Sequence, residues 1–116
     1  MNDSLCIFCK IARHEIPAKI IFEDENVIAF EDLKPQAPVH ILIIPKIHIA
    51  KISDLTPSES IMAGRLVDAA NNIAKAKGVD QSGYRLIFNC NKDAGQEVFH
   101  IHLHLLGGRK FNWPPG

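Results

Sequence analysis

One stretch near the C-terminus decides the fold: Phe99-His100-Ile101-His102-Leu103-His104-Leu105-Leu106. Histidine and apolar residues alternate along it, and successive side chains of a strand point to opposite faces of a sheet. We therefore expect a strand over Phe99–Leu106, with His100, His102 and His104 on one face. The apolar residues between them then belong to the core.

Three histidines on one face of a strand indicate a catalytic or metal-binding site. Neutral imidazoles side by side make a poor solvated surface, and their charged forms repel one another. Two interpretations remain open at this point. Imidazoles at alternate strand positions can bind zinc, or one imidazole can attack a substrate while its neighbours orient it and handle protons. Histidine suits the second role because its pKa lies near neutral pH.

The rest of the chain predicts an α+β fold with a mainly antiparallel sheet. Before the histidine strand we expect a short helix over Leu5–His14, a hairpin of Ile20–Glu23 and Val27–Phe30, a strand over Val39–Ile44, a long helix from the N-cap Thr56 to the stop at Gly78, and a strand over Tyr84–Phe88. Thr56, Pro57 and Glu59 have the spacing of a capping box. Five strands and two helices in this order are typical of the α+β class. We expect residues 1–116 to form a single domain.

Composition excludes several classes of protein. Hydrophobic residues make up 47% of the 116, which is too apolar for a disordered chain. Acidic and basic residues balance at 13 each, so we expect no nucleic-acid partner. The longest apolar run, Ile41–Ile44, is too short to cross a membrane. The start, Met1-Asn2-Asp3-Ser4, lacks the features of a signal peptide, so we expect a cytoplasmic protein without structural disulfides.

Two further motifs could belong to a site. The loop from Asn89 to Glu97 is polar, and Gly95 allows backbone N–H groups to approach an anion closely. Cys6-Ile7-Phe8-Cys9 is a Cys-x-x-Cys pair at metal spacing, although a redox motif or two buried thiols would look the same. Zinc would need two more ligands, for which His48 and His100 are the candidates.

These residues together resemble the histidine triad family, whose signature alternates histidine with apolar residues. The segment from His100 to Leu106 satisfies this signature at every position. Four other segments also match the family: Phe30–His40, Ile43–Lys46, Gly95-Gln96 and Leu106–Arg109. The ending Trp113-Pro114-Pro115-Gly116 is similar to the histidine triad nucleotide-binding branch, the purine nucleoside phosphoramidases. The resemblance covers nearly the whole chain.

The resemblance implies a fold and an activity. The fold is a five-stranded antiparallel sheet with two helices, and two subunits form a homodimer with one ten-stranded sheet. The activity is hydrolysis of the P–N bond of adenosine 5′-phosphoramidates, including aminoacyl-adenylate-like substrates, to AMP and an amine. It proceeds through a nucleotidyl-histidine intermediate and needs no organic cofactor.

The resemblance also assigns roles to residues. His102 would be the nucleophile, and His104, His40 and His100 would complete the catalytic set. Asp32 would hold the ribose hydroxyls. The purine slot would be lined by Ile7, Phe8, Ile11, Phe30 and Leu33, and the α-phosphate would lie on Asn89, Gly95 and Gln96. A structural zinc would be held by Cys6, Cys9, His48 and His100, as in some bacterial triad proteins and the related galactose uridylyltransferases.

One position departs from the pattern. Eukaryotic members carry a serine, thought to help the leaving group, where this chain has Glu97. Glu97 could do the same if protonated, could favour a cationic amine by charge, or could point to solvent.

Three other functions stay open. The first is a nucleotide-binding regulatory module with vestigial activity. The second is a dinucleoside polyphosphate hydrolase of a sister branch, against which the Trp-Pro-Pro-Gly ending weighs. The third is a metal-dependent hydrolase with the three histidines as zinc ligands. Against the third, the Cys-x-x-Cys pair is a more suitable set of zinc ligands than the three histidines. No acidic residue that could act as the general base lies at a recognisable spacing from them.

Overall fold

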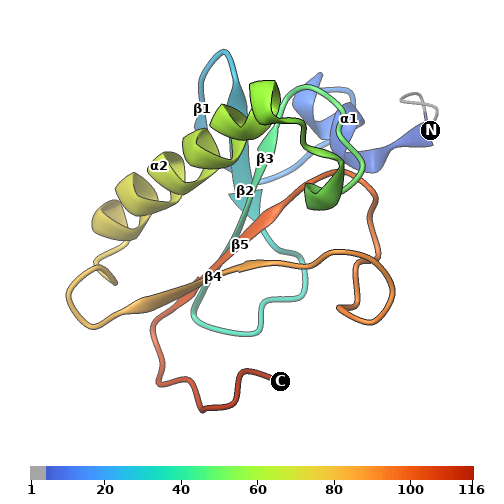
Figure 1. The fold of residues 1–116 in the computed structure, drawn as a ribbon. Coiled ribbons are helices and arrows are strands. Elements are labelled where there is room, and N and C mark those ends of the chain that lie inside the picture. Colours follow the sequence, from blue (N-terminus) through green and yellow to red (C-terminus); the bar gives the residue numbers. More distant parts are fainter. Residues whose placement is uncertain (1–4) are drawn as a thin grey trace.

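Five strands form one antiparallel sheet in the computed structural model, which describes residues 5–116. They are β1 (Ile20–Glu23), β2 (Val27–Glu31), β3 (Val39–Pro45), β4 (Tyr84–Phe88) and β5 (Leu103–Gly107). Their order across the sheet is β1-β2-β3-β5-β4, and every neighbouring pair is antiparallel (Figure 1). The expected sheet is therefore confirmed. The expectation drawn from Met1–Ser4 falls outside the described residues.

The two helices cover opposite faces of this sheet, α1 (Ile7–Ala12) one face and α2 (Ser60–Ala76) the other. Alternate residues of β3 show this division, because Ile41 and Ile43 lie in the core beneath α2 while Leu42 and Ile44 lie in the core with α1. Among the described residues, no helix has the length and hydrophobicity to cross a membrane.

The ends of α2 follow the expected signals with one difference. The Thr56 N–H donates to the Glu59 carboxylate at 3.1 Å, as a capping box requires. The first turn, Pro57–Glu59, is a 3₁₀ turn, so the regular α-helix begins at Ser60. Gly78 ends the helix with a φ of +75°, a backbone conformation that glycine adopts without a steric cost.

The last strand is shorter than predicted, since it begins at Leu103 and not at Phe99. Its neighbour β4 ends there, because Phe88 pairs with Leu103, and the pairing with β3 stops at the same residue, opposite Ile43. The chain before it bonds elsewhere, and the Ile101 N–H donates to the Ile49 carbonyl at 2.8 Å. The alternation of faces nevertheless continues, with Ile101 in the α2 core.

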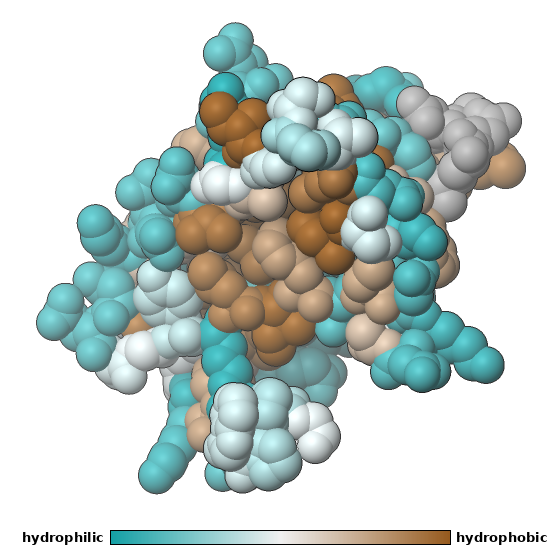
Figure 2. Space-filling model, in the orientation of Figure 1, coloured by the Kyte–Doolittle hydropathy of each residue, from teal (hydrophilic) through white to brown (hydrophobic). Residues whose placement is uncertain are grey.

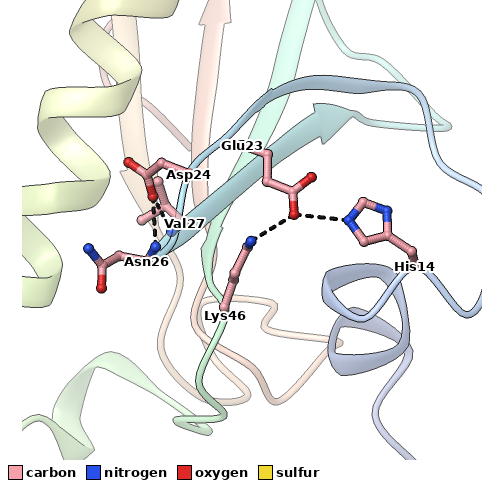
Figure 3. Close-up of polar contacts among 6 residues, drawn as sticks. All are labelled: His14, Glu23, Asp24, Asn26, Val27 and Lys46. Atoms are coloured by element: carbon pink, nitrogen blue, oxygen red, sulfur yellow. Dashed lines mark hydrogen bonds and ion pairs between the residues drawn. The ribbon is translucent and has the colours of Figure 1, made fainter.

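The first helix is also shorter than predicted. It ends at Ala12, and His14 takes a left-handed conformation with a φ of +59°. From there His14 Nε2 lies 2.9 Å from Glu23 Oε2, which also pairs with Lys46 Nζ at 2.7 Å (Figure 3). These contacts link the end of α1, the edge strand β1 and the residue after β3. The pKa of Glu23 is held below its usual value, first by Lys46 and then by His14.

The β1–β2 hairpin contains the predicted tight turn. The Asp24 carboxylate accepts from the N–H groups of Asn26 and Val27 at 2.7 and 2.8 Å (Figure 3). Further along, the pairing of β1 with β2 shifts register between Ile20 and Phe22, which is a β-bulge in the edge strand.

Candidate active site

A cavity of about 740 Å³ opens on the α1 face of the sheet, a volume typical of small-molecule sites. Its walls come from α1, from β2 and the chain that follows it, from the Asn89–Val98 loop and from β5. Its polar lining includes Asp32, His40, Asn89, Glu97, His102 and His104. The structure therefore brings residues far apart in the chain to one cavity, as the sequence predicted.

One end of the cavity is apolar. All five residues predicted for a purine slot line it: Ile7, Phe8, Ile11, Phe30 and Leu33. Phe8 packs edge-to-face on Phe30, with ring centroids 5.5 Å apart, and on His102 at 5.2 Å. Leu33 differs from the others because its side chain is 96% exposed, so it lies at the rim.

The protonation state of His102 follows from one contact. Its Nδ1 lies 2.8 Å from the backbone carbonyl oxygen of His100. A carbonyl oxygen only accepts, so Nδ1 carries the proton and Nε2 of the neutral ring carries a lone pair. His102 is buried, and its ring also meets His104 at 5.1 Å. Nε2 of His102 is thus prepared to act as a nucleophile.

The protonation of the other two histidines follows in the same way. The Gln36 N–H donates to His40 Nδ1 at 3.0 Å, so the proton of neutral His40 is on Nε2. His40 Nε2 lies 2.9 Å from His104 Nδ1, to which it donates. His104 then carries its own proton on Nε2. The site presents a lone pair on His102 and an N–H donor on His104.

Burial keeps this histidine pair neutral. It lowers the pKa of His104 to about 4, with further lowering from His102 and His40, against the opposing effect of Asp32. Burial also lowers the pKa of His40, and Asp32 partly opposes the shift. At neutral pH, His40 and His104 therefore each keep a single proton, on Nε2, and the donor chain from the Gln36 N–H through His40 to His104 is retained.

Asp32 lies between the histidines and the rim. One oxygen accepts from the Lys34 N–H at 2.8 Å, and the other lies 3.5 Å from His40 Nε2. A carboxylate has about four acceptor positions, so both oxygens can accept further hydrogen bonds from a ligand in the cavity.

The Asn89–Val98 loop differs in part from its predicted role. The Gly95 N–H donates to Lys92, and the Gln96 N–H donates to Asn91, so neither is turned to the cavity. Gly95 itself lines the cavity with a φ of +82°. Both the backbone N–H and the side chain of Gln96 bond within the fold, so the structure does not turn them toward the cavity for the expected phosphate contact.

The buried Gln96 side chain holds the loop in place. Its amide nitrogen donates to the carbonyls of Ala50 and Val98 at 2.9 and 3.1 Å, and its oxygen accepts from the Asn91 N–H at 2.9 Å. Asn89 and Glu97, on either side, do line the cavity. Glu97 is exposed, and Asn89 is half-buried.

His100 does not belong to the cavity. It is fully buried, and its Nδ1 lies 3.3 Å from Cys6 Sγ and 3.5 Å from Cys9 Sγ. Its expected place in the catalytic set is corrected, because the side chain faces the cysteines and only its backbone carbonyl reaches His102. The three triad histidines therefore do not converge on one metal position.

Four side chains meet instead on the far side of α1. The ligand atoms of Cys6, Cys9, His48 and His100 all lie within 4.8 Å of one another. Cys6 caps α1 and Cys9 lies one turn later, while Cys9 Sγ is 3.2 Å from His48 Nδ1. His100 Nε2 donates to the Pro45 carbonyl at 2.8 Å, which leaves Nδ1 unprotonated toward the sulfurs.

This group fits zinc. Two cysteines and two histidines are a common tetrahedral donor set. With Zn–S near 2.3 Å and Zn–N near 2.0 Å, a tetrahedral angle separates sulfur from nitrogen by about 3.5 Å. The sulfur–nitrogen distances of 3.2, 3.3 and 3.5 Å are close to this value.

The C-terminal tail borders a second hollow of about 720 Å³ on the other side of His40 and His104. Phe111 anchors the tail, because the guanidinium groups of Arg85 and Arg109 lie 5.3 and 4.3 Å from its ring centroid. Trp113 lines this hollow and is largely exposed.

The most important contact that sequence reasoning missed is the Gln36 N–H on His40. A backbone N–H donor cannot be recognised from the type of residue that carries it. The only signal in the sequence is the pair Pro35 and Pro38, which restricts the loop that carries Gln36 just before His40.

An antiparallel sheet carries a buried histidine with an unprotonated Nε2 and a second histidine with an N–H donor beside a cavity of nucleotide size, an arrangement typical of a hydrolase. The HIT domain family matches residues 13–111, and the chain belongs to this family.

Relatives support the assignment. The purine nucleoside phosphoramidase of Escherichia coli K12 is 52% identical over 103 residues, covering 89% of this chain and 87% of that protein. The crystal structure of a HIT family hydrolase from Legionella pneumophila is 56% identical with a TM-score of 0.94, covering 96% of this chain and 99% of that one. A histidine triad protein from Clostridium difficile is 47% identical with a TM-score of 0.93, and 97% of each chain is covered.

Proposed function

We propose that the protein is a purine nucleoside phosphoramidase that hydrolyses adenosine 5′-phosphoramidates to AMP and an amine. The observation that carries the proposal is the 2.8 Å contact between His102 Nδ1 and the His100 carbonyl, which leaves Nε2 as a nucleophile in the cavity. The name of the Escherichia coli relative supports the choice of substrate.

The reaction has two displacements. His102 Nε2 attacks the phosphorus, a P–N bond to histidine forms, and the bond to the amine breaks as the amine takes up a proton from solvent, which the attacking water of the second step returns. Water then attacks the nucleotidyl-histidine, AMP leaves, and His102 regains its lone pair. His104 Nε2–H donates to a phosphoryl oxygen throughout, where negative charge develops.

The remaining lining residues bind the nucleotide. Phe8, Phe30 and their apolar neighbours pack on the purine, and Asp32 accepts from the ribose hydroxyls. Asn89 donates to the α-phosphate in place of the engaged Gly95 and Gln96 N–H groups. Glu97 lies at the wall of the cavity where the amine leaves.

The test is hydrolysis of an adenosine 5′-phosphoramidate of tryptamine, followed by indole fluorescence. We expect turnover by the wild-type protein and none by His102→Ala, with AMP still bound by the variant. His14→Asn is the matched control, because His14 is an exposed histidine and asparagine tolerates its left-handed backbone. Full turnover by His102→Ala would contradict the assignment of the nucleophile.

The same experiment separates the alternatives. AMP binding by a wild-type protein that never turns over would favour a regulatory nucleotide-binding module. A dinucleoside polyphosphate cleaved faster than the phosphoramidate would favour the sister branch. Turnover abolished by brief EDTA in a protein that remains folded and keeps His102 protonated at Nδ1 would favour metal catalysis.

We also propose that Cys6, Cys9, His48 and His100 hold a structural zinc. The donor set and its distances support this. When bound, zinc would cross-link α1 to the chain after β3 and to the segment before β5. We also propose a cytoplasmic location.

We further propose that residues 1–116 act as one domain and that two copies form a homodimer through β4. β4 is an edge strand whose five residues are all half-buried. Apolar side chains gather between α2 and β4 (Figure 2). Pairing of β4 with its copy would join two sheets into one of ten strands. Sedimentation at micromolar concentration tests this, and a monomer there would contradict it.

A further inference from the structure

His100 belongs to two arrangements at once. Its Nδ1 faces the sulfurs of Cys6 and Cys9 at 3.3 and 3.5 Å. Its backbone carbonyl accepts from His102 Nδ1 at 2.8 Å, the contact that sets the tautomer of the nucleophile. The thiol–imidazole cluster and the reacting nitrogen are therefore joined through one residue.

The segment that carries His48 also holds this residue in place. His100 Nε2 donates to the Pro45 carbonyl, and the Ile101 N–H donates to the Ile49 carbonyl, both at 2.8 Å. The His48 ring meets the His100 ring edge-to-face at 5.1 Å. A shift of the His48 segment must therefore move the His100 carbonyl.

The short helix α1 makes a second connection. Phe8 lies between the two cysteines in sequence, and its ring packs against His100 at 6.0 Å and against His102 at 5.2 Å. Asp32, on the ribose side, has its contacts with the Lys34 N–H and with His40, and not with the four residues of the cluster. Movement of the cluster therefore affects His102 more than the ribose side of the cavity.

We propose that the cluster of Cys6, Cys9, His48 and His100, when it holds zinc, is the positioning device of the nucleophile. It fixes the His100 carbonyl, which keeps the proton of His102 on Nδ1 and the lone pair on Nε2. His48, which lies outside the cavity, is thereby a positioning residue for the reaction. This inference rests on the proposed function and assigns the cluster a role beyond stability.

The test compares zinc-loaded wild-type protein with His48→Ala. Zinc content is measured directly, and the ring nitrogens of His102 are followed by ¹⁵N NMR, with the resonances assigned against His102→Ala. We expect the wild-type ring to show one tautomer, protonated at Nδ1. In His48→Ala we expect loss of zinc, a mixture of tautomers and a kcat at least about tenfold lower, with KM changed by less than about threefold.

Two further variants separate positioning from stability. His48→Cys retains a three-cysteine, one-histidine zinc site and should restore both the tautomer and kcat. Leu66→Ala removes packing from the α2 core on the opposite face of the sheet, so this variant should also be less stable. It should nevertheless keep the His102 tautomer and the kcat of the wild-type protein. If His48→Ala does not fold, wild-type protein stripped of zinc below its unfolding temperature supplies the same readouts.

The outcomes are distinct. An unchanged His102 tautomer and kcat after zinc loss would overturn the inference while leaving the proposed function intact. Equal losses of kcat in Leu66→Ala and His48→Ala would also overturn it, as would a wild-type protein that binds no added zinc. A tautomer that changes with zinc in a protein without phosphoramidase activity would support positioning and contradict the proposed function.

Discussion

Backbone groups set the chemistry of the histidines. The His100 carbonyl accepts from His102, and the Gln36 N–H donates to His40, which in turn donates to His104. His102 thus presents an unprotonated Nε2, and His104 presents an N–H donor. The side chains supply the reacting atoms, and the backbone selects the tautomers.

His40→Asn tests the donor chain. The asparagine oxygen can still accept from the Gln36 N–H, but its amide cannot reach His104 as His40 Nε2 does. His104 then loses the donor that fixes its tautomer, and we expect kcat to fall by roughly tenfold to a hundredfold. Steady-state kinetics beside His14→Asn check this. Equal kcat values in the two variants would contradict the donor chain.

The low pKa of His104 predicts how stability changes with pH. A histidine titrates near 6.5 in the unfolded chain and near 4 in this fold, so the unfolded state binds more protons between these values. Stability is therefore full above pH 6.5 and falls as the pH drops toward 4.

Unfolding of the wild-type protein and of His104→Asn measures this contribution. The asparagine keeps an acceptor for His40 but does not titrate. We expect the wild-type free energy of unfolding to decrease relative to that of the variant as the pH falls from 6.5 to 4. A constant difference over this range would show that His104 is not held neutral.

Residue types predicted much of this site. The alternation around His102 placed the histidines correctly, and the purine-slot residues do line one cavity. The role of Gln96 was not predictable, because a sequence does not show whether an amide turns inward to bond with Ala50 or outward to a ligand. His100 was assigned two roles, and the direction of its side chain, toward the sulfurs of Cys6 and Cys9, separates them.

At the scale of elements, α1 serves two sites within six residues. Cys6 and Cys9 face the thiol–imidazole cluster, while Ile7, Phe8 and Ile11 line the cavity. Because these residues interleave along one helix, inserting a residue between the cysteines would rotate one set away from its site by about 100°. The spacing of the Cys-x-x-Cys pair is thus fixed by the cavity as well as by the cluster.

The Asn89–Val98 loop depends on the buried amide of Gln96. Gln96→Ala removes its three side-chain hydrogen bonds and leaves buried backbone groups without partners. We expect a loss of about 1–3 kcal/mol in the free energy of unfolding and a raised KM, because Asn89 and Glu97 lose their support. Urea unfolding and kinetics measure both. Lys92→Ala, an exposed change in the same loop, should alter neither.

Element boundaries were predictable where local chemistry decides them. The capping box at Thr56 and the left-handed Gly78 specify the ends of the long helix. The start of β5 was missed because the pattern around His100 fits a strand, yet β4 ends opposite Leu103 and the Ile101 N–H bonds to Ile49 rather than to β3. Pairing partners are a property of the whole sheet.

At the scale of the whole molecule, zinc would join three distant parts of the chain. We expect removal of zinc with a strong chelator to lower the melting temperature by about 10 °C or more. Cys6→Ser should have a similar effect. Cys90→Ser should not, because Cys90 contacts Ser53 away from the cluster. Calorimetry with and without zinc checks this, and equal melting temperatures would contradict a structural metal.

The two edges of the sheet are not equivalent. β1 carries a bulge, and its neighbourhood is charged, with Lys19 paired to Glu31 and Glu23 paired to Lys46. Such features discourage further strands from adding to an edge. β4 has a regular register along its whole length. The proposed pairing through β4 would use the one receptive edge of each copy, so the assembly would close at two and would not continue into a filament.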